Sequence, residues 1–182
     1  MQVEAGLRRT SDPITAESIE ATNPWKPPTP IQSVCTQMNI DNLRTLFAGG
    51  ASVKFADMKT AIGPTCAACV FSQSGGSNWQ PFVEFSNAFI QNTFGACEAL
   101  LDTTACGKAV YEWDSCLKTA CPADTCTDAK TCYAKARSGA CKAVDSNVAT
   151  ACPKIADTEA TCGDLVSAII EACAGGVDAG VN

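Results

Sequence analysis

The feature that most constrains this chain is the segment from Cys97 to Cys173, which holds ten of the thirteen cysteines. Cytosolic proteins seldom keep many cysteines as disulfides, and zinc sites usually use histidine or repeated Cys-x-x-Cys pairs. The sequence has no histidine, and Cys66-Ala67-Ala68-Cys69 is its only Cys-x-x-Cys pair. These observations favour disulfides over a metal cluster. Because the number of cysteines is odd, at least one is left as a free thiol or an intermolecular bridge.

Cysteine spacing within this segment predicts helices that are stapled to one another. Eleven residues on a helix make about three turns and advance about 16 Å, so Cys141 and Cys152 face the same way but lie too far apart to bond. Cys162 and Cys173 repeat that spacing, and antiparallel packing predicts the bridges Cys152–Cys162 and Cys141–Cys173. The partners of the other cysteines stay open: Cys35, Cys66, Cys69, Cys97, Cys106, Cys116, Cys121, Cys126 and Cys132.

Residues 1–34 are predicted to form an extended proline-rich arm, because they hold five of the nine prolines and proline restricts both its own φ and the preceding residue. Such an arm is either a tether or a segment that docks on a neighbouring molecule. For the second alternative, the candidate docking residues are Trp25, Pro27, Pro28 and Trp79.

Residues 35–174 are predicted to form one disulfide-rich helical domain, with an aromatic half (35–96) and a cysteine-rich half (97–174). Apolar spacing indicates helices around Ile40 to Phe47 and Phe55 to Ile62, with a break at Gly63-Pro64 and a short helix carrying Cys66 and Cys69. Each of these two cysteines is expected to bridge to another segment. Ser72 to Asn78 reads as a loop, and residues 175–182 as a flexible tail.

Three phenylalanines, Phe82, Phe85 and Phe89, follow the i, i+3, i+7 spacing of a helix face. A ring stripe of this kind is usually core, and the alternative is a wall of an apolar ligand pocket. The expected fold class is therefore all-α: a disulfide-stapled helical bundle or irregular helical array with an extended arm.

A faint repeat relates residues 105–125 to residues 140–158, including Thr-Ala-Cys-Pro in both copies.

Several motifs around the cysteines carry a resemblance: Thr65-Cys66-Ala67-Ala68-Cys69-Val70-Phe71, Asn78-Trp79-Gln80-Pro81, Gly95-Ala96-Cys97, Ala105-Cys106-Gly107, Cys116 with Thr119-Ala120-Cys121, and Ser138-Gly139-Ala140-Cys141. Together they resemble a group of secreted, cysteine-rich, largely uncharacterised proteins of myxobacteria. The resemblance implies export and disulfide bonding, and it brings no activity or catalytic residues with it. On this basis we expect an extracellular or cell-surface protein whose signal peptide is absent from this chain.

Composition excludes several classes of function. Histidine-dependent hydrolases and zinc enzymes are excluded by the lack of histidine, and no glycine-rich phosphate loop is present. A net charge of −6 without a basic tract argues against nucleic acid, and the run Leu165 to Val177 is too short to span a bilayer. Two carboxylate pairs, Glu112 with Asp114 and Asp157 with Glu159, are read as solvated surface charges. No catalytic, cofactor-binding or metal-ligating residue is expected unless the thiols are reduced, which would suit Cu(I).

Three functional hypotheses follow, of which the last in rank is an enzyme or enzyme inhibitor whose site has no recognisable motif. The first is a non-enzymatic extracellular structural or protein-interaction module, a subunit of a surface or filamentous assembly joined through its N-terminal arm. The second is a carrier of a small hydrophobic ligand, such as a lipid, a sterol or haem, held between aromatic helices. A protein partner or self-association is expected under the first hypothesis, and a small apolar ligand under the second.

Overall fold

The computed structural model describes residues 13–22, 24–29, 33–49, 53–85, 88–91, 93–122, 128–162 and 164–174. Within these ranges the chain forms nine helices and one three-stranded sheet. The helices are α1 (Ala16–Thr22), α2 (Gln37–Ala48), α3 (Phe55–Val70), α4 (Thr93–Leu101), α5 (Thr104–Ala120), α6 (Ala129–Ser138), α7 (Lys142–Ala151), α8 (Ile155–Cys162) and α9 (Leu165–Cys173). The strands are β1 (Phe71–Gln73), β2 (Phe82–Phe85) and β3 (Ala88–Gln91). The expected helical fold class is confirmed.

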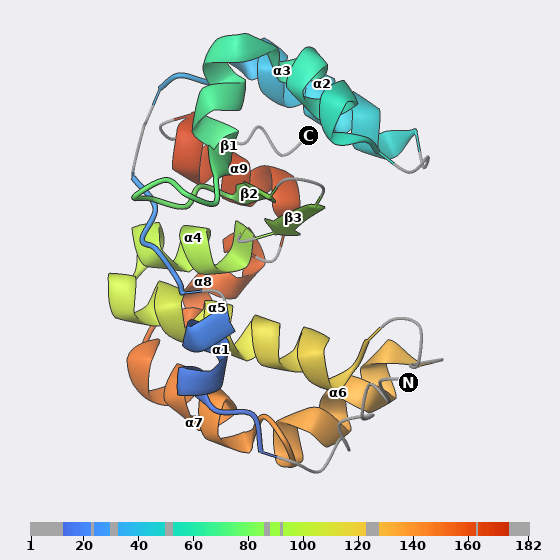
Figure 1. Ribbon diagram of the computed structural model, residues 1–182. Helices are drawn as coiled ribbons and strands as arrows, with labels where there is room; N and C mark the ends of the chain where they lie inside the picture. The colour runs from blue at the N-terminus through green and yellow to red at the C-terminus, as the bar shows by residue number, and fades with distance from the viewer. Residues whose placement is uncertain are drawn as a thin grey trace.

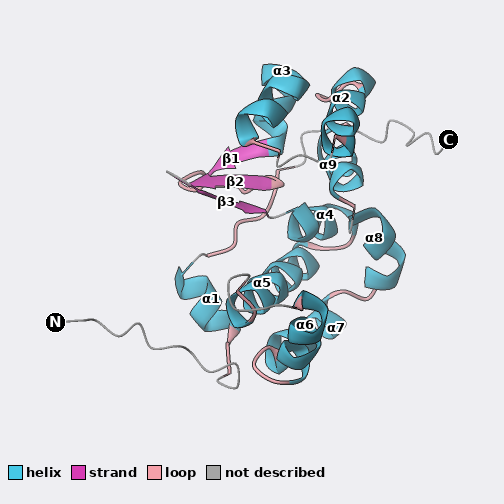
Figure 2. Ribbon diagram, turned by 90° about the vertical axis from the view of Figure 1, so that its right-hand side faces the viewer, coloured by secondary structure: helices cyan, strands magenta, loops and turns pink. Residues whose placement is uncertain are grey.

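The elements form an elongated stack. Helices α2, α3 and α9 lie at one end, α4 and α8 in the middle, and α5, α6 and α7 at the other end, with the sheet beside the boundary between the first two groups (Figures 1 and 2). Buried side chains form one large cluster at each end, the first around Ile40, Leu43 and Ile169 and the second around Tyr111 and Val144.

Local signals explain the ends of α2 and the break in α3. Thr36 caps α2 and shares a reciprocal capping box with Asn39, and Gly49 follows the last turn. Gly63 has a φ of 71°, a left-handed conformation that glycine adopts without a steric penalty. It divides α3 at the predicted break, in front of Pro64, so that Cys66 and Cys69 lie on the second part of this helix.

The helix expected over Phe82 to Phe89 is wrong, because these residues form β2 and β3. Strand β1 pairs with β2 in parallel, placing Phe71 opposite Phe82, and β2 pairs with β3 in antiparallel fashion. The rings of Phe71 and Phe82 stack with centroids 5.3 Å apart. Pairing with residues eleven positions earlier, which helical periodicity does not report, therefore decides the conformation of this segment.

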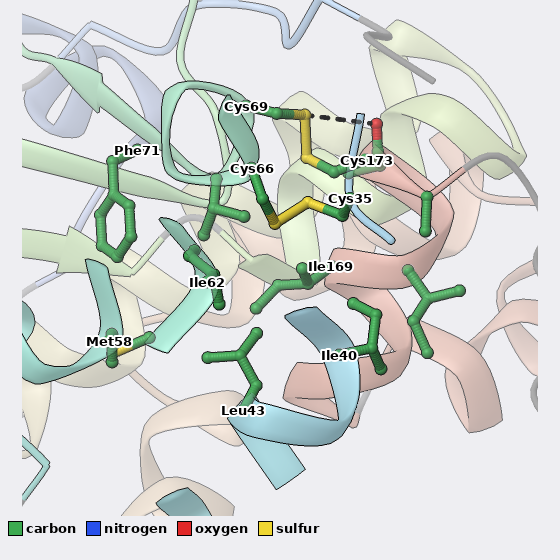
Figure 3. Packing of buried hydrophobic residues seen from close by; sticks show 14 of the residues in the cluster. Cys35, Ile40, Leu43, Met58, Ile62, Cys66, Cys69, Phe71, Ile169 and Cys173 are labelled. Carbon is green, nitrogen blue, oxygen red and sulfur yellow. Dashed lines mark hydrogen bonds between the residues drawn. A yellow bond between two sulfur atoms is a disulfide. The ribbon is translucent and has the colours of Figure 1, made fainter. Parts of the chain in front are cut away.

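Six disulfides staple the elements together: Cys35–Cys66, Cys69–Cys173, Cys97–Cys162, Cys106–Cys152, Cys116–Cys141 and Cys121–Cys132. The Cys66 and Cys69 thiols bridge to different segments, as predicted (Figure 3). All twelve cysteines within the described residues are paired, and Cys126 lies outside them.

The predicted bridges Cys152–Cys162 and Cys141–Cys173 are wrong. The prediction treated the residues around Cys162 and Cys173 as one helix, but Asp164 caps a new helix, so these cysteines lie on α8 and α9. Cys162 bonds to α4 and Cys173 bonds to α3. The related expectation that cysteines eleven apart on one helix do not bond each other holds for Cys141 and Cys152.

Helices α5 and α7 run antiparallel and are bridged twice. Cys106, near the start of α5, bonds to Cys152, the C-cap of α7, and Cys116 bonds to Cys141, the N-cap of α7. The repeated Thr-Ala-Cys-Pro motif has one local structure in both copies: Cys121 and Cys152 are C-caps with φ near −120° and ψ near 70°, each followed by proline. The sequence repeat thus marks two similar helix ends.

The N-terminal segment is not simply an extended arm. Residues 16–22 form α1, whose Ile19 is buried in the second core cluster. The backbone N–H of Ile14 donates to the carbonyl of Ala140. Residues 24–29 belong to no helix or strand and run along the body of the chain toward the sheet (Figure 1). Residues 1–12 and 175–182 lie outside the described residues.

None of the helices in the described ranges combines the length and the apolar composition needed to cross a bilayer.

Candidate functional site: the Trp113 cleft

The predicted docking residues contact one another within the chain. Trp79 is only 2 % exposed, and its backbone N–H donates to the carbonyl of Pro27 at 3.4 Å. Pro28 is buried and Trp25 is half-buried against the second core cluster. The side chain of Lys26 donates to the carbonyls of Ser74 and Gly76. Residues 24–29 therefore dock on their own chain, which leaves Trp79 covered.

The predicted phenylalanine pocket is not found at Phe82. This residue is buried in the first core cluster against Phe71, while the side chains of Phe85 and Phe89 lie outside the described part of the structure. The i, i+3, i+7 spacing gathers residues on one face of a helix but not of a strand. Phe82 is thus a core residue.

The acidic pairs do not form a catalytic arrangement. Glu112 is buried and pairs with Lys108, so it is not the solvated charge that was expected. Asp114 bonds to Lys118 on the same helix. The side chains of Asp157 and Glu159 are not among those that the structure describes. Within the described residues, no group of three or more His, Cys, Asp or Glu side chains has the geometry of a metal site.

A cleft of about 250 Å³ lies among α4, α5, α6, α7 and the start of α8. We call it the Trp113 cleft, and its lining residues are Phe94, Trp113, Arg137, Asp145, Val148, Ala149 and Ile155. Five of these seven are apolar or aromatic, and the remaining two carry opposite charges. Small-molecule and side-chain sites combine apolar walls with a few oriented polar groups in this way.

Asp145 connects the polar groups of the cleft. Its Oδ1 accepts a hydrogen bond of 2.9 Å from Nε1 of Trp113 and one of 2.9 Å from Nε of Arg137. The guanidinium carbon of Arg137 lies 5.4 Å from the centre of the Trp113 ring, a distance at which the cation is attracted to the ring face. These three side chains hold one another in a defined arrangement.

The aromatic wall is completed by Phe94, which meets Trp113 edge to face with centroids 6.5 Å apart. Such a geometry is favourable for two rings. Val148 and Ile155 are half-buried beside them and pack in the cluster that contains the Cys106–Cys152 bridge. The floor of the Trp113 cleft is therefore apolar and continuous with the core.

Disulfides on both sides fix the walls of the cleft. On α5, Trp113 is flanked by Cys106 and Cys116, and both cysteines bond to the ends of α7. Asp145 and Val148 lie on α7 between those two bonds. The two helices cannot separate without breaking a covalent bond, so the cleft is already formed before anything binds to it.

A buried carboxylate on α4 forms a hydrogen bond to α8. Glu98 is 0 % exposed, and its Oε2 accepts a hydrogen bond of 2.7 Å from Oγ1 of Thr158 on α8. Close packing of α4 on α5 surrounds it: a Cβ at Gly107 would lie 2.4 Å from the Cβ of Ala99. Because Glu98 is enclosed in this packing, we assign it a structural role.

The sequence revealed only part of the Trp113 cleft. Trp113 falls at helical spacing with Cys106, Val110 and Leu117, a pattern that the sequence shows, but Arg137 and Asp145 carry no distinguishing signal. The two residues are eight positions apart, on either side of the turn between α6 and α7. Only folding of the chain brings their side chains into contact.

Comparison of the chain with known protein families, with characterised proteins and with solved structures found no match.

Proposed function

We propose that the protein is a non-enzymatic, extracellular protein-interaction module, which receives an apolar side chain of a partner protein in the Trp113 cleft. The observation that carries this proposal is the preformed aromatic cleft between two helices that are bonded to each other at both ends. A rigid pocket loses little conformational entropy when it is filled, and buried aromatic anchors supply much of the energy of protein interfaces.

The size of the cleft favours a single side chain over a carried lipid, sterol or haem. Pockets for whole small molecules typically measure about 300–1,000 Å³, whereas a cavity of about 150 Å³ already accommodates benzene. The volume of about 250 Å³ lies between these values. It suits one ring or branched aliphatic group with its attachment, so the carrier hypothesis ranks second.

The disulfide framework supports the extracellular part of the proposal. Six disulfides are consistent with an oxidising compartment. Restricting the unfolded chain at six points also resists local opening, which exposes a protein to proteolysis. We propose export for this reason, in line with the implication of the resemblance to secreted myxobacterial proteins.

The proposal is tested with an uncharged apolar probe. Titration of ¹⁵N-labelled protein with N-acetylphenylalaninamide should shift the indole N–H resonance of Trp113 saturably and leave the resonances of Trp25 and Trp79 in place. The Ala149→Trp substitution puts a large side chain into the cleft and should abolish the shift. Ala134→Trp on the exposed surface of α6 is the matched control and should not change it. Absence of any saturable shift at the Trp113 resonance would overturn the proposal.

A further inference from the structure

Resting on the proposed function, we infer that the Trp113 cleft recognises the carboxyl terminus of a partner polypeptide whose last residue is aromatic or branched aliphatic. The terminal side chain enters the apolar floor, the terminal carboxylate binds Arg137, and the last backbone N–H donates to Asp145. The side chain, the carboxylate and the backbone N–H all belong to the last residue of a polypeptide. The cleft offers an apolar floor to the first, Arg137 to the second and Asp145 to the third.

The carboxylate is assigned to Arg137 from its unused donors. Arg137 engages Asp145 through Nε alone, and no further hydrogen bond is found for its guanidinium among the described residues. The two terminal nitrogens of the group remain, side by side, in the arrangement that binds both oxygens of a carboxylate. The side chain is 55 % exposed at the rim of the cleft, so an anion can reach it.

Asp145 supplies the acceptor for the backbone N–H. Both of its hydrogen bonds from Trp113 and Arg137 go to the same oxygen, Oδ1. Within the described part of the chain no partner is found for Oδ2, and the side chain is 31 % exposed. A donor and an acceptor therefore lie next to each other on one rim, which matches the carboxylate and N–H that share the last Cα of a polypeptide.

Charge around the rim favours an anion. The negative charge of Asp145 is balanced by Arg137 at 2.9 Å. Lys142 stands one turn before Asp145 on α7, on the same side of that helix, and is exposed. Lys142 thus adds a second cation on this side of α7, beside the neutral Arg137–Asp145 pair, in a chain whose overall charge is −6. A terminal carboxylate is attracted to such a site.

The test compares two tetrapeptides that differ only at the terminus: acetyl-Gly-Gly-Gly-Phe with a free carboxylate and the same peptide as its carboxamide. Binding is followed at the Trp113 indole resonance. The free acid should bind at least about tenfold more tightly, since hydrogen bonds between charged groups are the stronger class. Arg137→Gln should remove this difference, and Arg137→Lys should restore part of it. Lys130→Gln, which removes an exposed charge from the same helix outside the cleft, should leave the difference unchanged.

The outcomes separate this inference from the proposed function. Equal binding of acid and amide, with both blocked by Ala149→Trp, would overturn the terminal-carboxylate inference and leave the apolar side-chain site standing. Failure of both peptides to bind, while N-acetylphenylalaninamide still binds, would overturn the terminal-carboxylate inference alone, and failure of all three probes would overturn both. If 3-phenylpropanoate or free phenylalanine binds as tightly as the peptide acid, the site takes small aromatic acids, and the assignment to a polypeptide terminus is wrong. The dispersion of the amide spectrum of each variant shows whether it remains folded.

Discussion

The indole Nε1 of Trp113 donates a 2.9 Å hydrogen bond to Oδ1 of Asp145 across the same two helices that the Cys116–Cys141 disulfide joins. Trp113 lies about one turn before Cys116 on α5, and Asp145 lies about one turn after Cys141 on α7. The covalent bond thus fixes the separation of the helices, and the hydrogen bond fixes the orientation of the ring. This relationship is what converts a packing contact into a defined cleft.

Removing the Asp145 carboxylate should destabilise the protein. The substitution Asp145→Ala leaves the half-buried indole N–H of Trp113 and the guanidinium of Arg137 without their acceptor. We expect a loss of about 1–3 kcal/mol in the free energy of unfolding, measured by urea denaturation with the disulfides intact. Asp145→Asn keeps an oxygen acceptor and should lose less. Equal losses in the two variants would contradict the assigned role of the carboxylate oxygen.

The contact between α4 and α5 predicts a second stability effect. At Gly107 a Cβ would lie 2.4 Å from both the Ala99 Cβ and the Gly95 carbonyl oxygen, so Gly107→Ala forces the helices apart. Overpacking of this kind costs about 1–3 kcal/mol. Gly75→Ala is the control, because nothing lies within 4 Å of a Cβ built there. A shift of the thermal midpoint in the Gly75 variant as large as in the Gly107 variant would count against the close helix contact.

Disulfide connectivity can be checked by peptide mapping without reduction. The structure predicts peptides that contain Cys106 joined to Cys152 and Cys116 joined to Cys141. Mass spectrometry of a digest at low pH, where thiol exchange is slow because thiolate is scarce, should recover both. Recovery of Cys152 joined to Cys162 would contradict the fold described above.

The number of free thiols gives an independent check. Because six bridges use twelve of the thirteen cysteines, thiol titration of the denatured, unreduced monomer should find one reactive group per chain. By elimination that group is Cys126, and Cys126→Ser should reduce the count to zero. A larger number in the wild-type chain would show that some bridges are absent. A covalent dimer on a non-reducing gel would place Cys126 in a bridge between chains.

The N-cap of α6 has a defined pH response. A hydrogen bond from the Thr131 hydroxyl, with others from the backbone N–H groups of Thr131 and Lys130, lowers the pKa of Asp128 below its ordinary value. Since the folded-state pKa is the lower one, the stabilisation from this cap is present above the unfolded pKa and is lost as the pH falls through the folded pKa. Carboxyl ¹³C titration should show the low pKa.

Thr131→Ala should raise the pKa of Asp128 toward the ordinary value, because it removes the largest cause of the shift. Thr150→Ala, which removes a hydroxyl bonded to the carbonyl of Ser146 on α7, should leave it in place. If the Asp128 titration does not respond to Thr131→Ala, the shift has another origin.

Local chemistry accounts for what the sequence predicted correctly. The helix break at Gly63 and the direction of Cys66 and Cys69 toward other segments depend on residues close together in the chain. Helical periodicity and cysteine spacing report such relationships directly. The helical class and the disulfide framework therefore followed from the residues themselves.

The errors arose where the partner is distant in the sequence. Phe82, Phe85 and Phe89 have the spacing of a helix face, but pairing of β2 with β1 and of β3 with β2 places them on strands. Residues 16–22 lie between Pro13 and Pro24, yet they form α1, because Ile19 packs in the second core cluster. In both cases tertiary contacts outweigh local preference, because burial of large side chains is worth more than the small differences in propensity.

The amino-acid sequence by itself determined that this protein is a helical, disulfide-bonded scaffold whose odd cysteine has no partner within a fully bridged chain. Only the tertiary structure decided which cysteines pair and where a binding site forms. The bonded residues are 11 to 104 positions apart, and spacing alone does not choose among the many pairings. The Trp113 cleft depends on that choice, because it exists only where the antiparallel alignment of α5 and α7 brings Trp113, Arg137 and Asp145 together.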